Sequence, residues 1–332
     1  MTRNKMSPSF GASVPTKGQS RTDPNTGAVL KRMTNKADVA GATDSLIVYS
    51  RFSPTSSDNS KALVHGGDST SAWVINVADL SIVRVLKHSD GRSIGEVNEI
   101  RWDGSGSYPN SVYYVNGLSF YQMDVVTGTV TLIRDFSSTF PGPFPNGAML
   151  MNDVEGDSSS NSRYWAWQII SIELQGPYKT RAILTYDKQT NTILSIITPA
   201  TFPLGKNYAG LGAIGYDYAT LGYLPRPNMV EISPKGTKAI IHFDRCYTGN
   251  RDLDIGTVLD GPHAWPLNLA ESTVAPNKPV KIAVDATHSG WSFGYAYTLR
   301  FIFCTFSVDN QKYSLANPKT KNDRQQGFQN ES

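Results

Sequence analysis

The sequence predicts an all-β protein made of repeated four-stranded antiparallel units, the architecture of a β-propeller. Two alternating apolar runs, 229–233 and 239–243, flank a turn at Pro234-Lys235-Gly236, a pattern typical of a β-hairpin. The second of these runs has a counterpart near the N-terminus, because Lys238-Ala239-Ile240-Ile241-His242 resembles Lys61-Ala62-Leu63-Val64-His65. Each copy follows a Ser-Pro dipeptide. Internal repetition of this kind favours a propeller over a β-sandwich, which needs fewer strands and predicts no repeats.

A second pattern, strand–polar turn–strand, recurs at 77–82, 124–130 and 186–193. Combined with the first, it defines a unit of four strands, which we call a to d. The first two intervals between units are about 50 residues, the length of a propeller blade. The insert 199–226, rich in Gly and Tyr, lengthens the third interval and is expected to cross one face as a loop. We place the unit starts near Ser45, Val97, Met149, Met229 and His288.

The elements follow in order along the chain. Residues 1–27 are polar and expected to be poorly ordered, and 27–34 are predicted to form a short strand that closes the ring from outside. The propeller domain spans 28–308, with blades at 45–86, 97–136, 149–197 and from 229 to near 284, and 309–332 form a polar tail. After Trp291 the pattern fails, so we expect an incomplete or irregular ring and a chain truncated or altered near its C-terminus.

Composition excludes some classes of function. Lys and Arg number 31 against 28 Asp and Glu, a balance that argues against nucleic-acid binding by a charged face. The 16 Tyr and 6 Trp suit carbohydrate, although aromatic residues are also common in strands. Two cysteines cannot support a disulfide framework, and no run is long enough for a membrane span. No signal peptide is visible, so the protein is expected to be cytosolic unless its true start is missing.

All five histidines map to one face of the predicted ring, that of the b-to-c and blade-to-blade connections. His263 and His288 are the strongest candidates, since each has small neighbours and precedes a Trp, Trp265 or Trp291. His65 and His242 end predicted strands. A structural role, in which each caps its strand by hydrogen bonding to a neighbouring blade, explains them as well as a functional role does. His88 lies in a plain turn. A polar excursion at 244–265 is longer than a b-to-c loop requires and is predicted to contact ligand.

The Ser-Pro…Lys-Ala-Ile-Ile-His unit, the Asp187-Lys188-Gln189-Thr190 hairpin and Thr287-His288-Ser289-Gly290-Trp291 resemble the propellers of polysaccharide lyases acting on oligogalacturonate and on ulvan. The resemblance implies β-elimination on a uronate-containing acidic polysaccharide, with a His base, a Tyr acid and an Arg that neutralises the carboxylate. The base is then His65, His88, His263 or His288, the acid Tyr164 or Tyr247, and the neutralising group Arg245, Arg226 or Arg181. Further predicted substrate contacts are Asp244, Trp265 and Trp291.

Alternatives remain open at this point. The same face can belong to a non-catalytic propeller that binds glycan or protein, or to a degenerate one. Asp153 and Glu155 are the candidate ligands of a structural divalent cation, Ca²⁺. We expect a monomer without nucleic-acid partners. Nucleophile-elbow, P-loop, dinucleotide and zincin motifs are absent from the sequence.

Overall fold

The computed structural model describes the parts of the chain that form the sheets and most of the connections between them. Within these parts the secondary structure is almost entirely β, with one single-turn helix, α1 (Tyr218–Leu221), and three 3₁₀ turns, η1 (Lys36–Asp38), η2 (Glu96–Asn98) and η3 (Pro199–Thr201). The all-β prediction is confirmed. The described residues are 15–22, 27–42, 44–48, 52–67, 70–144, 146–152, 155–173, 178–202, 218–243, 261–269, 280–282, 289–292, 296–299 and 302–307.

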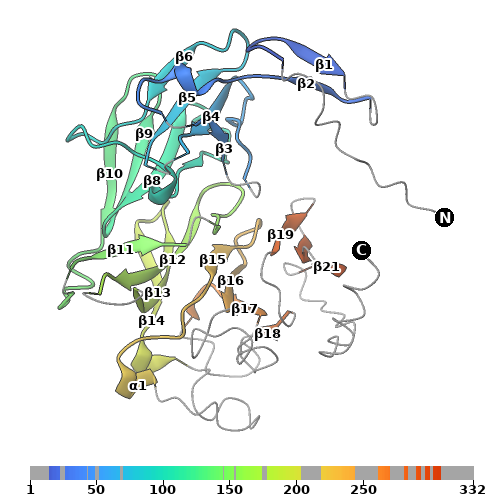
Figure 1. The fold of residues 1–332 in the computed structure, drawn as a ribbon. Coiled ribbons are helices and arrows are strands. Elements are labelled where there is room, and N and C mark those ends of the chain that lie inside the picture. The colour runs from blue at the N-terminus through green and yellow to red at the C-terminus, as the bar shows by residue number, and fades with distance from the viewer. Residues whose placement is uncertain are drawn as a thin grey trace.

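Four antiparallel sheets of four strands follow one another along the chain, and we call them blades one to four (Figure 1). Within each blade the strands are hydrogen-bonded in chain order. Blade one has β3 (Leu46–Ile47), β4 (Lys61–His65), β5 (Ala72–Asn76) and β6 (Ile82–Val85); blade two has β7 (Arg101–Trp102), β8 (Ser111–Asn116), β9 (Ser119–Asp124) and β10 (Val130–Asp135). Blade three has β11 (Ala148–Met151), β12 (Tyr164–Ser171), β13 (Lys179–Asp187) and β14 (Thr192–Ile197); blade four has β15 (Met229–Ile232), β16 (Lys238–Phe243), β17 (Gly261–Pro266) and β18 (Val280–Lys281).

A fifth sheet contains three described strands, β19 (Ser289–Ser292), β20 (Ala296–Leu299) and β21 (Ile302–Ser307). The first strands of the five sheets start at 46, 101, 148, 229 and 289, no more than four residues from the predicted unit starts. The repeated blades make the fold a β-propeller. An irregular C-terminal blade stays a prediction, because residues 293–295, 300–301 and 308–332 lie outside the described residues. Among the described residues no helix is long and apolar enough to span a bilayer.

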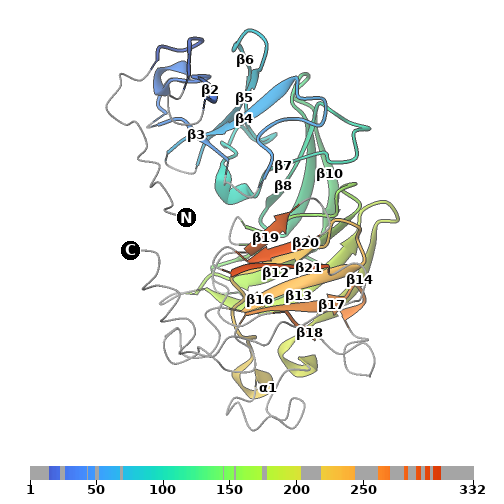
Figure 2. The ribbon, with the colours of Figure 1, turned by 90° about the vertical axis from the view of Figure 1, so that its right-hand side faces the viewer.

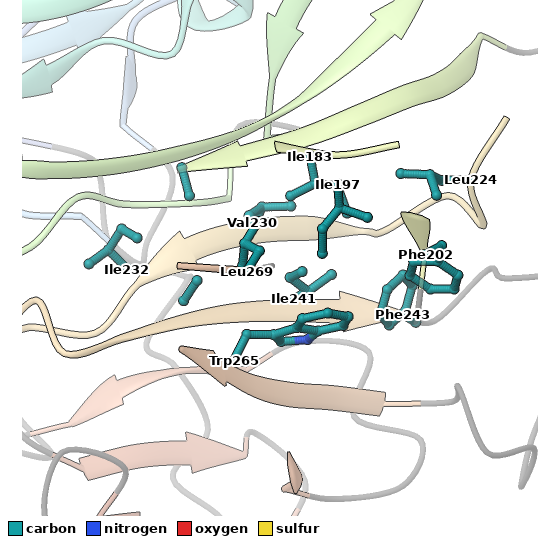
Figure 3. Packing of buried hydrophobic residues seen from close by; sticks show 12 residues of the cluster. Ile183, Ile197, Phe202, Leu224, Val230, Ile232, Ile241, Phe243, Trp265 and Leu269 are labelled. Carbon is teal, nitrogen blue, oxygen red and sulfur yellow. The ribbon is translucent and has the colours of Figure 1, made fainter. Parts of the chain in front are cut away.

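Apolar cores lie between consecutive blades, because alternate residues of a strand point to opposite sides of its sheet. Leu63 and Val74 of blade one pack with Val112 and Tyr114 of blade two. Their neighbours in sequence point the other way, so that Tyr113 and Val115 of blade two face Trp165 and Trp167 of blade three. Figure 3 shows the next interface, where side chains of blade three face those of blade four. Labelled members of that cluster are Ile183, Ile197, Val230, Ile241 and Trp265.

The side of blade one that faces away from blade two is covered by the N-terminal segment. Met33, Val39 and Ala42 pack on a cluster that includes Trp73 and Ile75. Before this segment, β1 (Ser20–Thr22) and β2 (Val29–Lys31) form a two-stranded ribbon, which Figure 1 and Figure 2 both place beside blade one. The sequence predicts the strand near β2 but no strand at β1.

The two ends of each blade differ in their connections. Since strands a to d alternate in direction, the a-to-b and c-to-d connections lie at one end, which we call the a–b end. The b-to-c and blade-to-blade connections lie at the other, which we call the b–c end. The prediction that the whole of 244–265 is a b-to-c loop is wrong at the C-terminal part of this segment. Residues 261–266 form β17, which pairs with β16 along six residue positions from Lys238↔Pro266 to Phe243↔Gly261.

Candidate binding site at the a–b end

A cavity of about 520 Å³ opens at the a–b end of the propeller. Residues from four blades line it: 52–59 from the a-to-b connection of blade one, 101–104 from blade two, 157–162 from blade three, and Glu231 and Pro234 from blade four. The topology explains this convergence, because every a-to-b connection emerges at the same end of the ring. The cavity therefore collects side chains that are far apart in the sequence.

Hydroxyl groups make up much of the cavity wall. Short turns fix several of them: the Ser56 hydroxyl donates to Asp58 Oδ1 at 2.6 Å, and the Ser159 hydroxyl donates to Asn161 Oδ1 at 2.7 Å. Hydrogen bonds from Ser56 and from Ser60 lower the pKa of the exposed Asp58 to about 2. Three of the wall's serines, Ser56, Ser159 and Ser162, are buried, and their hydroxyls are bonded within the protein. The exposed or half-buried alcohol groups of the wall belong to Ser53, Thr55, Ser57, Ser158 and Ser160.

Arg101 supplies the cationic side chain of the described wall, and its donors are directed to the protein. Nε and Nη2 donate to the carbonyl of Gly156 at 3.2 and 2.7 Å, and Nη1 donates to the carbonyl of Ile100 at 3.0 Å. Its guanidinium carbon lies 3.4 Å from the centre of the Phe52 ring. The arginine therefore joins blades one, two and three at the base of the cavity.

Three carboxylates, Asp103, Asp157 and Glu231, also line the cavity. Asp103 is 2% exposed and accepts hydrogen bonds from the Tyr113 hydroxyl at 3.2 Å and from the Ser105 hydroxyl at 2.5 Å. Lys188 Nζ donates to the same Tyr113 hydroxyl at 2.8 Å. Burial raises the pKa of the Tyr113 hydroxyl, and burial lowers the pKa of Lys188 while the charge of Asp103 partly offsets this. The result is a hydrogen-bonded chain from the blade-three turn to the cavity wall.

Close backbone contacts hold blades three and four together beside the cavity. The Ile232 amide donates to the Asp157 carbonyl at 2.9 Å, and the Ser160 amide donates to the Pro234 carbonyl at 2.9 Å. A Cβ at Gly156 would lie 2.1 Å from the carbonyl oxygen of Val230. Glycine is therefore required at 156 for this approach.

The described histidines, His65, His88, His242 and His263, lie toward the opposite, b–c end and do not line this cavity. His65 ends β4, His242 lies near the end of β16 and His263 near the start of β17. All three are buried, with exposed fractions of 4%, 0% and 0%. In β16 and β17, His263 pairs with Ile241 and Pro262 pairs with His242, so strand alternation puts the two histidines on opposite sides of blade four. The structure thus does not bring them to a shared opening.

His88 is the half-buried histidine of the blade one to blade two connection. Its Nδ1 lies 2.6 Å from the Tyr114 hydroxyl, and its ring meets Tyr121 edge-on at 4.7 Å between centroids. Burial raises the pKa of the Tyr114 hydroxyl. For His65, burial lowers the pKa to about 4, and its Nδ1 has no hydrogen-bond partner in the part of the chain that the structure describes.

The other predicted site residues are dispersed. Tyr164 begins β12 at the a–b end, with the Arg163 guanidinium 4.7 Å above its ring. Arg181 donates to Glu173 Oε1 at 2.9 Å and to the Ser171 hydroxyl at 2.8 Å, and Arg226 covers the Tyr178 ring at 3.9 Å. Trp265 belongs to the core between blades three and four, not to an exposed platform. Asp153, Asp244, Arg245, Tyr247 and His288 lie outside the described residues, as does the side chain of Trp291.

The predicted cation site has one described member, Glu155. Glu155 is 7% exposed, and its Oε2 accepts from the Asn228 side-chain amide at 3.3 Å. Among the described residues, no three His, Cys, Asp or Glu side chains form a group able to hold a metal ion.

The serine-rich wall is not among the sites predicted from the sequence. A signal was present, because Ser53-Pro54-Thr55-Ser56-Ser57 and Asp157-Ser158-Ser159-Ser160 both follow first strands of blades. Blade topology sends both segments to the same end.

No family model and no curated protein matches the sequence. Solved propeller structures have a similar fold at low identity. An oligogalacturonate lyase from Vibrio parahaemolyticus is 14% identical with a TM-score of 0.48, over 84% of this chain and 64% of that one. TolB from Acinetobacter baumannii is 10% identical with a TM-score of 0.35, over 68% of this chain and 42% of that one. The chain thus spans less than two thirds of the length of either, and these likenesses concern the fold alone.

Proposed function

We propose that this propeller binds a saccharide in the cavity at the a–b end and performs no bond cleavage there. The observation that carries the proposal is the cavity itself, which combines the exposed or half-buried hydroxyls of Ser53, Thr55, Ser57, Ser158 and Ser160 with the ring of Phe52. Its volume of about 520 Å³ lies within the range of small-ligand sites, about 300 to 1,000 Å³. Neutral hydroxyl groups in fixed positions match the hydroxyls of a sugar, because both donate and accept hydrogen bonds.

The charge of the wall argues against a uronate at this place. The described lining has three carboxylates, Asp103, Asp157 and Glu231, and one guanidinium, whose donors bond to backbone carbonyls. Like charges repel most strongly where water is partly excluded. A neutral saccharide is therefore a better ligand for this cavity than the acidic polysaccharide that the resemblance implies.

The test is titration calorimetry with neutral oligosaccharides and with oligogalacturonates on the full chain. Ser57→Trp places a large side chain in the cavity mouth and should weaken binding of the neutral sugar at least about tenfold, or by about 1.4 kcal/mol. Ser89→Trp, an equally exposed serine at the b–c end, is the matched control and should bind as the wild type does. No binding of any sugar, or equal binding by both variants, would remove the proposal.

Elimination at the b–c end is a second candidate, favoured by the 2.6 Å contact of His88 Nδ1 with the Tyr114 hydroxyl. In this candidate His88 is the base that the lyase resemblance implies, and the Tyr114 hydroxyl, on a side chain that is 1% exposed, orients the imidazole ring. His88 is more accessible than His65, His242 and His263, which are buried. Ultraviolet absorbance of an unsaturated sugar end on oligogalacturonate or ulvan, lost in His88→Ala, would support this candidate. A silent assay on both substrates would exclude it.

A further inference from the structure

The charges of the cavity wall differ in how accessible they are to a ligand. Arg101 is 8% exposed; its donors meet the carbonyls of Gly156 and Ile100, and its flat face lies on Phe52. Asp157 forms a long ion pair with Arg101, 4.0 Å from Oδ1 to Nε, and its side chain is 41% exposed, so that its carboxylate is more accessible from the cavity than the guanidinium. A molecule entering the cavity therefore meets the Asp157 carboxylate before it meets a positive charge of the described wall.

The surroundings of Asp157 are rich in hydroxyl groups. The Ser158 amide donates to Asp157 Oδ1 at 2.7 Å, which fixes the carboxylate at the start of a serine run. Ser160 is an exposed serine of the same run, and Ser57 and Asn59 line the cavity from the blade-one connection. A cationic group bound at Asp157 would thus have alcohol and amide partners around it.

From this juxtaposition we propose that the ligand is an amino sugar, with its ammonium group at Asp157 and its hydroxyls at the serines of blades one and three. This inference rests on the proposed function and narrows its ligand class. An ammonium gains from a half-buried carboxylate through charge and through its hydrogen-bond donors. A neutral sugar gains only the hydroxyl contacts, so the charged group should decide between otherwise similar sugars.

The experiment compares the glucosamine trimer with its fully N-acetylated form by titration calorimetry at about pH 5.5, where the sugar amines are protonated. The two ligands share ring and linkage and differ at the nitrogen, which is a charged ammonium in one and a neutral, larger acetamide in the other. We expect the free amine to bind at least about tenfold more tightly to the wild type. Asp157→Asn keeps the size and an acceptor for the Ser158 amide and should abolish the preference. Asp79→Asn is the control, because the Asp79 carboxylate likewise accepts a hydrogen bond from a serine amide but is exposed outside the cavity.

The outcomes separate this inference from the proposed function. Equal affinity for the amine and the N-acetyl form would overturn the amino-sugar assignment and leave saccharide binding in place. A preference that persists in Asp157→Asn would likewise overturn it. Absence of binding by both trimers and by every neutral oligosaccharide would remove the proposed function itself. Circular dichroism of Asp157→Asn checks that a lost preference does not reflect a lost fold.

Discussion

Burial decides which histidines of this chain are available for chemistry. His65 meets no described partner at Nδ1 and is held largely uncharged because burial lowers its pKa from 6.5 to about 4. A base of that kind accepts protons weakly near neutral pH, and substrate cannot reach a side chain that is 4% exposed. We therefore expect His65 to affect the stability of the fold and not catalysis.

We predict that His65 makes the fold sensitive to acid. The unfolded chain protonates this side chain below about pH 6.5 and the folded chain only below about pH 4, so the unfolded state binds more protons between these values. The free energy of unfolding should fall by at most about 3 kcal/mol as the pH falls through that window. Urea unfolding at several pH values, followed by tryptophan fluorescence, measures the fall. His65→Phe should show a shallower profile; a parallel profile in the variant would contradict the prediction.

A second residue-scale prediction concerns Gly156. The added methyl of Gly156→Ala would lie 2.1 Å from the Val230 carbonyl oxygen and 2.8 Å from Asn152 Cβ, so blades three and four must separate. We expect a loss of about 3 kcal/mol or more in the free energy of unfolding. Gly91→Ala is the control, because nothing lies within 4 Å of its Cβ and only its left-handed backbone, with φ of 85°, adds a cost of about 1 kcal/mol. Equal losses in the two variants would show that the close approach does not constrain the fold.

At the scale of elements, consecutive blades are joined by polar contacts as well as by their apolar cores. Arg84 of β6 reaches the turn between β9 and β10, where Nε and Nη2 donate to the carbonyls of Val125 and Val126 at 2.9 and 2.7 Å. Gly128 in that turn leaves room for the guanidinium, because a Cβ there would lie 2.6 Å from Arg84 Nη1. The arginine thus joins the fourth strand of one blade to the next blade.

We predict that Arg84→Met lowers the free energy of unfolding by about 1 kcal/mol, since two charge-assisted hydrogen bonds are lost and part of the site is exposed. Arg92→Met serves as the comparison: its ion pair with Asp90 lies within one turn, and the two side chains are 67% and 44% exposed. The comparison variant should change stability little. Chemical denaturation of the wild type and both variants measures the free energies of unfolding. An Arg84→Met protein as stable as the wild type would argue against a stabilising role for this contact.

At the scale of the whole molecule, the N-terminal segment covers the apolar side of blade one that faces away from blade two. In a closed ring this side packs against the last blade. Here Met33, Val39 and Ala42 of the N-terminal segment pack on it. Polar contacts hold the segment together, including Lys17 Nζ to Asp38 Oδ2 at 2.8 Å. The segment therefore covers an apolar surface that water would otherwise reach.

Removing residues 1–43 should expose that surface and cause self-association, because a contiguous apolar patch is disfavoured in water. The exposed side chains would be Ala62, Val64, Trp73, Ile75 and Leu80. Size-exclusion chromatography with light scattering measures the change in mass. Removing residues 1–14 alone keeps the covering segment and should leave the elution unchanged. A monomeric protein after the longer deletion would mean that the segment is dispensable for solubility.

The sequence by itself determined the repeated blades. Alternating apolar runs and turn residues are local signals, and they located the five unit starts because strand pairing within a blade joins neighbours in the chain. It did not determine β17, because residues 261–266 carry Gly, two Pro and a His, and only pairing with β16 makes this segment a strand. Burial of His242, His263 and Trp265 likewise depends on which blade packs against which. The cavity was decided by tertiary structure alone: its serines, Arg101 and carboxylates are separated by up to about 180 residues, and only the common direction of the a-to-b connections brings them together.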